Sequence, residues 1–161
     1  MAKATPATRA LDRLGIPYSL HAYAYDPEAP RIGLQAAEAL GVGPDRVLKT
    51  LMAAVDGKPV CLLVASDQEV SMKRVAAAFG GKAAAMLKVP DAERLTGYHV
   101  GGISPLGQKK AVPTLVDAGS LAPEGEIREE VYVNGGGRGL QIRIRPDDLL
   151  RALGARTAAL I

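Results

Sequence analysis

The sequence predicts one α+β domain built around a mixed, largely antiparallel β-sheet. Three observations favour this fold class. The length of 161 residues is typical of a single domain, apolar segments with strand periodicity occur in hairpins, and helical segments lie between these hairpins. We therefore treat residues 1–161 as one domain.

The expected helices are marked by capping residues and by apolar residues at helical spacing. In the first helix Thr5 can serve as the N-cap, Pro6 suits the first helical position and Gly15 can end the helix. Its expected buried stripe consists of Ala7, Ala10, Leu11 and Leu14. Further helices are expected at 32–40, at 72–79 after a Ser71 cap, at 91–95 and at 146–153.

The expected strands are short apolar or alternating segments bounded by turn residues. Residues 18–25 alternate between two faces, and the Asp56-Gly57 turn joins segments 47–55 and 60–65 into a hairpin. The remaining strands are expected at 83–87, 112–116, 131–134 and 140–144.

Composition excludes several classes of protein. The net charge of +3 is too small for a polybasic nucleic-acid binder, although short basic clusters, such as that around Arg138, are either phosphate contacts or solvated surface. One cysteine, Cys61, excludes a disulfide framework, and it lies in an apolar run where it would be a core residue. Two histidines are too few for a histidine-based metal centre, so we expect no metal and no cofactor.

The expected localisation follows from the lengths of the apolar segments. None approaches the ~20 residues of a membrane-spanning helix, and the first residues carry no apolar signal-peptide core. We expect a soluble cytoplasmic protein without a membrane partner.

Lys49 interrupts the apolar strand 47–55, on the side of Leu51, Ala53 and Val55 if the pleat is regular. Lysine is seldom buried without a partner. Either its stem packs while the amine reaches water, or the ammonium projects into a pocket and meets a phosphate or a developing negative charge.

Two glycine-rich segments can approach a ligand closely. Residues 97–107 contain Gly101, Gly102 and Gly107, with Pro105 stiffening the loop, and can present backbone N–H groups to an oxyanion or phosphate. Residues 134–139 are either a loose hairpin turn or a pocket wall. Neither segment matches a dinucleotide or P-loop motif, and Ser104 lies outside a Gly-x-Ser-x-Gly context. The residues therefore predict a pocket without a conventional nucleophile.

These same residues resemble the YbaK/ProX family of trans-editing aminoacyl-tRNA deacylases, relatives of the insertion domain of bacterial prolyl-tRNA synthetase. The resemblance runs nearly end to end. Its most specific part is GYHVGGISPLGQKK at 97–110, and it also includes LHAY at 20–23, VLKTL at 47–51 and YVNGGGRGL at 132–140.

The resemblance implies a single domain with a curled, barrel-like sheet and removal of misattached cysteine from tRNA(Pro), with Cys-tRNA(Cys) as a further substrate. The cysteine thiol would attack its own ester and leave as a thiolactone, so that the protein only orients it and stabilises charge. Lys49 and Gly101 would carry the chemistry. The implied substrate-binding residues are Tyr23, Thr50, Gly102, Ile103, Ser104, Pro105, Asn134, Gly135 and Gln141. The implied partners are the 3′ end of an aminoacylated tRNA and prolyl-tRNA synthetase; the oligomeric state is undetermined.

Two positions depart from the family pattern, because Asn134 replaces a serine and Gln141 replaces an aspartate. The second change removes a carboxylate, so the amino-acid selectivity can differ. Gln141 is alternatively a solvent-facing residue of its strand. A broader deacylase acting on alanyl- or seryl-tRNA, and a non-catalytic module that binds tRNA or a synthetase, remain alternatives.

Overall fold

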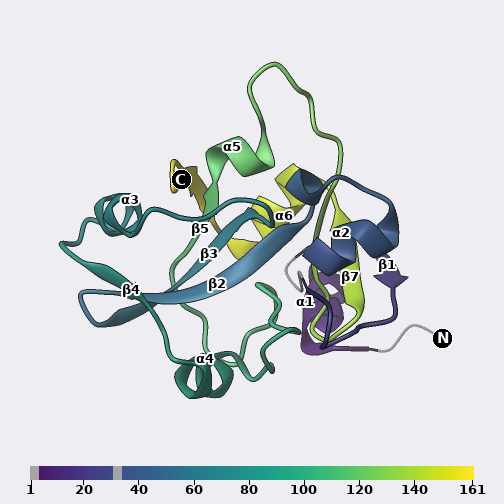
Figure 1. Cartoon of the computed structure of the whole chain (residues 1–161), viewed down its shortest axis with the longest axis horizontal. Coiled ribbons are helices and arrows are strands. Elements are labelled where there is room, and N and C mark those ends of the chain that lie inside the picture. The colour runs from purple at the N-terminus through teal and green to yellow at the C-terminus, as the bar shows by residue number, and fades with distance from the viewer. Residues whose placement is uncertain (1–3, 31–33) are drawn as a thin grey trace.

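The computed structural model describes residues 4–30 and 34–161, which form two β-sheets surrounded by helices (Figure 1). The smaller sheet is antiparallel, with strand order β1-β7-β6, and the larger sheet is mixed, with order β4-β2-β3-β5-β8. The strands are β1 Ser19–Ala22, β2 Leu48–Val55, β3 Lys58–Ala65, β4 Ala84–Met86, β5 Thr114–Asp117, β6 Val131–Asn134, β7 Leu140–Ile144 and β8 Arg156–Ala158. This confirms an α+β domain with a mixed, largely antiparallel arrangement.

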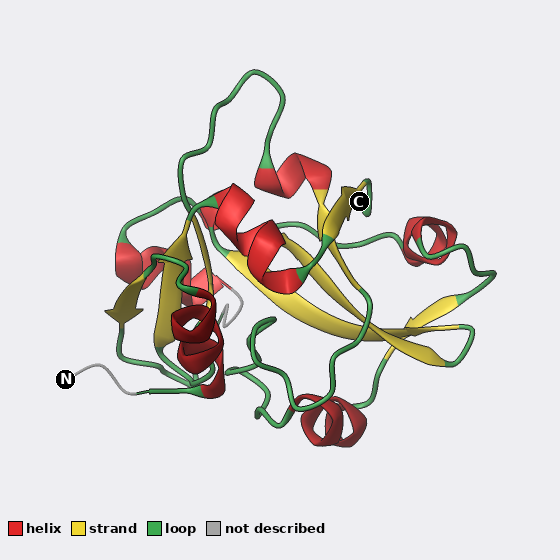
Figure 2. Ribbon diagram, turned by 180° about the vertical axis from the view of Figure 1, so that it is seen from behind, coloured by secondary structure: helices red, strands yellow, loops and turns green. Residues whose placement is uncertain are grey.

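The helices cover both faces of the larger sheet and the back of the region where the sheets meet. In Figure 1, α3 and α4 lie on opposite sides of the larger sheet, and Figure 2, seen from behind, shows α6 in front of the junction of the two sheets. The helices are α1 Pro6–Leu14, α2 Gln35–Leu40, α3 Met72–Ala78, α4 Val89–Thr96, α5 Ala118–Leu121 and α6 Pro146–Leu153. A 3₁₀ turn, Pro44–Arg46, precedes β2. The expected helix start at residues 32 and 33 lies outside the described residues.

The first helix forms for the predicted reasons, with one correction. The Thr5 hydroxyl accepts the N–H of Thr8 at 3.2 Å, and the helix ends at Gly15. Leu14 was expected in the buried stripe but is 57% exposed. The chain turns at Gly15, and the next residue, Ile16, donates its N–H to the Leu11 carbonyl and packs into the core instead.

The hairpin formed by β2 and β3 is the centre of the larger sheet. Its two-residue turn, Asp56-Gly57, has positive φ at both positions, which is the geometry of a type I′ turn. The Asp56 carboxylate also accepts the N–H groups of Lys82 and Ala83, so it holds the start of β4 beside the turn. A turn predicted from two residues therefore organises three strands.

The two sheets meet at the start of β2, where Val47 forms an isolated parallel bridge with Tyr132. The described strands form two open sheets, so the curled, barrel-like arrangement that the resemblance implied is not closed into a barrel. Because β2 pairs with β3 and only briefly approaches β6, its first half keeps a free edge at the junction.

Candidate functional site

A cavity of about 320 Å³ opens at the junction of the two sheets. Its walls come from β2, from the glycine-rich loop 97–107, and from the facing ends of β6 and β7. It is within the size range of small-molecule sites. The predicted site residues that line it are Tyr23, Lys49, Thr50, Gly101, Ile103, Asn134 and Gln141.

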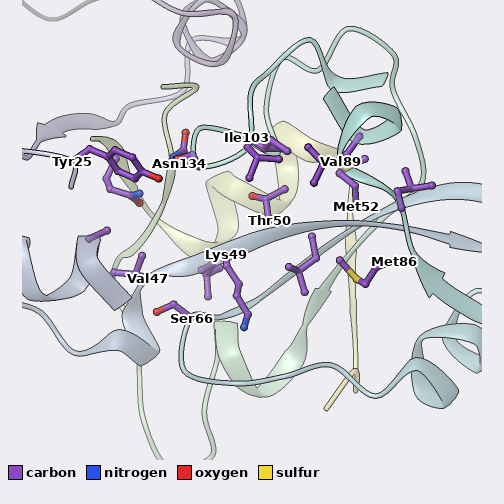
Figure 3. A pocket seen from close by; sticks show the side chains of 18 of the residues that line it. Tyr25, Val47, Lys49, Thr50, Met52, Ser66, Met86, Val89, Ile103 and Asn134 are labelled. Atoms are coloured by element: carbon purple, nitrogen blue, oxygen red, sulfur yellow. The ribbon is translucent and has the colours of Figure 1, made fainter. Parts of the chain in front are cut away.

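The free edge of β2 explains why neighbouring residues of one strand line the same cavity. β4 pairs with Ala53–Val55, and Leu87 donates its N–H to the Met52 carbonyl at 3.0 Å, so the edge over residues 48–51 is left open. Figure 3 shows Thr50 pointing toward Ile103, and Lys49 leaving the strand in the opposite direction, on the side of Ser66. The cavity therefore extends around the strand edge and reaches both side chains.

Lys49 is half-buried on the side of β2 that also carries Ala53 and Val55, as the alternation predicted. Ser66 beside it donates its hydroxyl to the Pro44 carbonyl at 2.6 Å. Within the described residues, Lys49 has no ion pair, so its charge is available to a ligand in the cavity.

Gln141 faces the cavity rather than solvent. It is 5% exposed, and in the β6–β7 ladder it stands opposite Asn134. The alternative that Gln141 is solvent-facing is therefore wrong. Burial raises the pKa of the neighbouring Tyr23 phenol, while a hydrogen bond with Gln141 acts in the other direction.

Two buried oxygens in the cavity wall have no hydrogen-bond partner within the described part of the chain. They are Thr50 Oγ1 and Gln141 Oε1. Buried polar atoms are nearly always paired, because an unpaired one costs about 1–3 kcal/mol. Both oxygens belong to residues that line the cavity, which makes them candidate acceptors for a ligand.

The glycine-rich loop 97–107 is held against the β6–β7 turn. Asn134 Nδ2 donates to the Gly101 carbonyl at 3.2 Å, and Arg138 Nε donates to the Val100 carbonyl at 3.0 Å. Gly101 has φ of +91°, which favours glycine. The loop backbone is thus fixed at the cavity wall.

Four predicted substrate-binding residues lie behind this wall. Ser104 is fully buried, and its hydroxyl accepts the N–H of Leu106. Gly102 and Pro105 are buried too, and the carbonyl of Gly135 accepts the Thr5 hydroxyl at 2.6 Å. In this structure these residues support the loop, and a direct contact with substrate stays a prediction for them.

The sequence reasoning missed the apolar end of the cavity, which α4 and β4 build. It is lined by Met52, Met86, Leu87, Val89 and Ala92 together with the predicted Ile103. Met86 and Val89 are about half exposed, an unusual state for large apolar residues beside a core. Before the fold is known, such residues resemble ordinary core residues, so the sequence carries no distinguishing signal.

Neither cysteine nor histidine is among the described residues that line the cavity. Cys61 is fully buried in the core, as expected, and burial raises the pKa of its thiol to about 12. The described residues also contain no group of three or more histidine, cysteine, aspartate or glutamate side chains that could hold a metal ion. Over the same residues, no helix has the length and apolar character needed to cross a membrane.

The model of the aminoacyl-tRNA editing domain family matches residues 26–152. The chain belongs to this family. A protein of Enterococcus faecalis named "Putative Cys-tRNA(Pro)/Cys-tRNA(Cys) deacylase EbsC" is 35% identical over 147 residues, covering 91% of this chain and 86% of that protein. The proline–tRNA ligase of Limosilactobacillus fermentum is 34% identical over 88 residues, which cover 52% of this chain and 15% of the ligase.

Solved structures confirm the fold of this editing domain. A crystal structure described as "a putative trans-editing enzyme for prolyl tRNA synthetase" superposes with a TM-score of 0.80 at 24% identity, over 99% of this chain and 98% of that one. The hypothetical protein APE2540 superposes with a TM-score of 0.81 at 23% identity, over 97% of this chain and 99% of that one.

Proposed function

We propose that this editing domain is a trans-acting deacylase that removes cysteine misattached to tRNA(Pro), with Cys-tRNA(Cys) as a second substrate. The observation that carries the proposal is the cavity: it offers a lysine, a fixed glycine loop and unpaired hydrogen-bonding oxygens, and its described lining holds neither cysteine nor histidine. Such a site suits a substrate that supplies its own nucleophile. The similarity to the Enterococcus faecalis protein supports cysteine as the amino acid.

The proposed reaction is an intramolecular thioester formation. The substrate thiolate attacks the ester carbonyl, a C–S bond forms, the bond between the carbonyl carbon and the ribose oxygen breaks, and the thiol proton ends on that oxygen. The products are a cyclic thiolactone and deacylated tRNA. Intramolecular attack has a high effective molarity, so the protein contributes mainly orientation and charge stabilisation.

The roles that we propose for the lining residues come from the family resemblance and are compatible with their positions. Lys49 provides the positive charge that holds the tRNA 3′ end, and Tyr23 lines the same cavity. The loop containing Gly101 places backbone against the ester and the terminal ribose. Ser66 is unsuited as nucleophile, because its hydroxyl already donates to the Pro44 carbonyl.

A broader deacylase, acting on alanyl- or seryl-tRNA through attack by water, is the second candidate. Asn134 and Gln141, which form facing positions of the β6–β7 ladder, favour it because both are neutral amides. The third alternative, a module that binds tRNA or a synthetase without catalysis, gives no reason for Lys49 in an apolar strand. Prolyl-tRNA synthetase remains a proposed partner that would supply tRNA specificity, since the chain carries a net charge of only +3.

Incubation with pre-charged Cys-, Ala- and Ser-tRNA(Pro) separates the three candidates. We expect rapid loss of cysteine and little loss of serine, since a thiol with a pKa of about 8.5 is partly ionised near neutral pH and a hydroxyl is not. Comparable rates on all three substrates would favour attack by water. Binding without cleavage of any substrate would leave the non-catalytic module.

Lys49→Ala tests the central residue of the proposal. We expect deacylation to fall about 10²-fold, the usual scale for one preorganised charge-stabilising group, while the thermal unfolding midpoint stays close to that of the wild type. Lys49→Arg should also be slow, because a planar guanidinium does not replace a compact ammonium. Lys58→Ala, at the exposed start of β3, is the matched control. Normal turnover in folded Lys49→Ala would remove Lys49 from the mechanism.

A further inference from the structure

Arg138 lies beside the cavity, held by contacts with two residues from other segments. Its Nε donates to the Val100 carbonyl at 3.0 Å, and its guanidinium lies over the Tyr25 ring, 5.7 Å from the ring centre. Val100 and Tyr25 both line the cavity, and so does Gly101 between them. An added Cβ at Gly101 would lie 3.0 Å from the Tyr25 hydroxyl and 3.2 Å from Arg138 Nε. The absent side chain at Gly101 therefore leaves room for this arrangement.

The Arg138 guanidinium is held in place, but most of its N–H donors have no acceptor within the described residues. It carries five N–H donors, and the Val100 carbonyl takes the one on Nε. Within the described residues, the two terminal nitrogens have neither a hydrogen bond nor an ion pair, which leaves a planar pair of donors facing outward. A carbonyl and a ring face restrict its rotation, so less conformational entropy is lost when it binds a ligand.

Several other arginines of the chain pair with carboxylates, whereas Arg74 and Arg145, like Arg138, form no ion pair within the described residues. Arg143 pairs with Glu130, and Arg128 pairs with Asp45 and Glu126. An acidic side chain also contacts this part of the loop: Glu93 accepts the Val100 N–H at 2.8 Å and lies 3.4 Å from His99 Nδ1. The Val100 N–H lowers the pKa of the Glu93 carboxyl most, and Arg138 acts on it only through its charge. Within the described residues, Arg138 thus has a carboxylate close enough to act through its charge but none within ion-pair distance.

We propose that Arg138 is a binding site for a phosphodiester, namely the phosphate on the 5′ side of the terminal nucleotide whose ester lies in the cavity. This assignment rests on the proposed function, which puts an aminoacylated 3′ end in the cavity. A planar pair of N–H donors matches two phosphate oxygens. The phosphate is one sugar away from the ester, and Arg138 contacts Val100 and Tyr25, which both line the cavity.

The first test compares two substrates that differ in this phosphate. For Arg138→Ala we expect kcat/KM on Cys-tRNA(Pro) to fall about tenfold, the scale of a lost hydrogen bond to a charged group. On 2′(3′)-O-cysteinyl-adenosine, which lacks the phosphate, we expect a clearly smaller fall, because this substrate is affected only by the loss of the Arg138–Val100 hydrogen bond that holds the loop. Arg138→Lys should recover only part of the loss, because a point charge does not donate in parallel. Arg74→Ala on α3 removes the same charge and should change neither rate.

The second test measures binding without cleavage. The affinity of a fluorescent RNA hairpin ending in CCA is measured across a range of salt concentrations. Removal of one phosphate contact should lower the slope of log Kd against log salt by about 0.7 in Arg138→Ala. Equal losses on both substrates, or an unchanged slope, would overturn the assignment. If the wild type cleaves neither substrate while the slope still falls, the proposed deacylation fails and the phosphate site stands.

Discussion

The charge balance of the cavity depends on Gln141. The described lining holds one lysine and no aspartate or glutamate. The resemblance drawn from the sequence implied an aspartate at position 141. The α-ammonium of an aminoacyl ester entering this cavity would therefore meet neutral acceptors. The two available are Gln141 Oε1 and Thr50 Oγ1, which lack partners among the described residues. An amide oxygen can orient an ammonium but attracts it less than a carboxylate.

Substitution of Gln141 tests this role. Gln141→Asp should keep or raise the activity on Cys-tRNA(Pro), because it restores a negative charge opposite the ammonium. Gln141→Leu should lower kcat/KM about tenfold by leaving the ammonium without its acceptor. Rates on Cys-, Ala- and Ser-tRNA(Pro) are the measurement, and Gln68→Leu, at an exposed turn, is the matched control. If both variants equal the wild type in rate and selectivity, Gln141 does not contact the substrate.

At the scale of elements, the cavity depends on the loop 97–107 lying close to the β6–β7 turn. The contacts that hold it run from Asn134 to the Gly101 carbonyl and from Arg138 to the Val100 carbonyl. A side chain at Gly101 would meet the Tyr25 hydroxyl and the Arg138 side chain beside the cavity. Its effect would therefore fall on the site more than on the core.

Gly101→Ala and Gly125→Ala separate these effects. Both glycines have positive φ, +91° and +76°, so alanine costs about 1–2 kcal/mol of backbone strain at either position. Around Gly125 an added Cβ meets nothing within 4 Å. We expect similar drops in the thermal unfolding midpoint, but a loss of deacylation of about tenfold or more only in Gly101→Ala. A Gly101→Ala protein whose folded fraction works normally would show a purely structural glycine.

Capping residues, turn residues and apolar periodicity predicted the elements that form through contacts between residues close in sequence. The Thr5 and Ser71 caps, the Asp56-Gly57 turn and the β6–β7 hairpin all depend on residues close in sequence, and the structure confirms them. The facing of Asn134 and Gln141 followed from that hairpin. The strand β8 is three residues long and pairs in parallel with β5, about forty positions earlier, so nothing local predicts it.

Only part of the site was predicted, because only some of its residues carry a signal in the local sequence. Lys49 stood out because a charge interrupts an apolar strand, whereas Met52 and Met86 carry no such signal. Their place in the cavity depends on where β4 stops pairing with β2. The point where β4 stops pairing with β2 is a property of the assembled sheet. The separation of the strands into two open sheets is also a property of the whole fold. Both depend on contacts between distant segments, which no single segment encodes.

At the scale of the whole molecule, a buried arginine ties the long loop before β6 to the turn before β2. The Arg128 side chain is 1% exposed; it donates to the Asp45 carbonyl at 2.7 Å and to the Ser120 carbonyl at 2.9 Å, and it pairs with the Asp45 carboxylate at 2.7 Å. Asp45 lies in the 3₁₀ turn that leads into β2, and Arg128 lies three residues before β6. The guanidinium thus holds together the two strands that meet at the cavity.

Arg128→Leu should destabilise the protein by about 1–3 kcal/mol, because the carbonyls of Asp45 and Ser120 lose their charged donor. The loss of the ion pair itself adds little, since the Asp45 side chain is half exposed to solvent. The matched control is Arg46→Ala, because Arg46 pairs with the same Glu126 at the surface, at 3.1 Å, and should cost less than about 1 kcal/mol. Urea unfolding measures both free energies. If the two variants are equally stable, Arg128 is not needed to hold the two sheets together. The junction at the cavity would then depend on the Val47–Tyr132 bridge and on core packing alone.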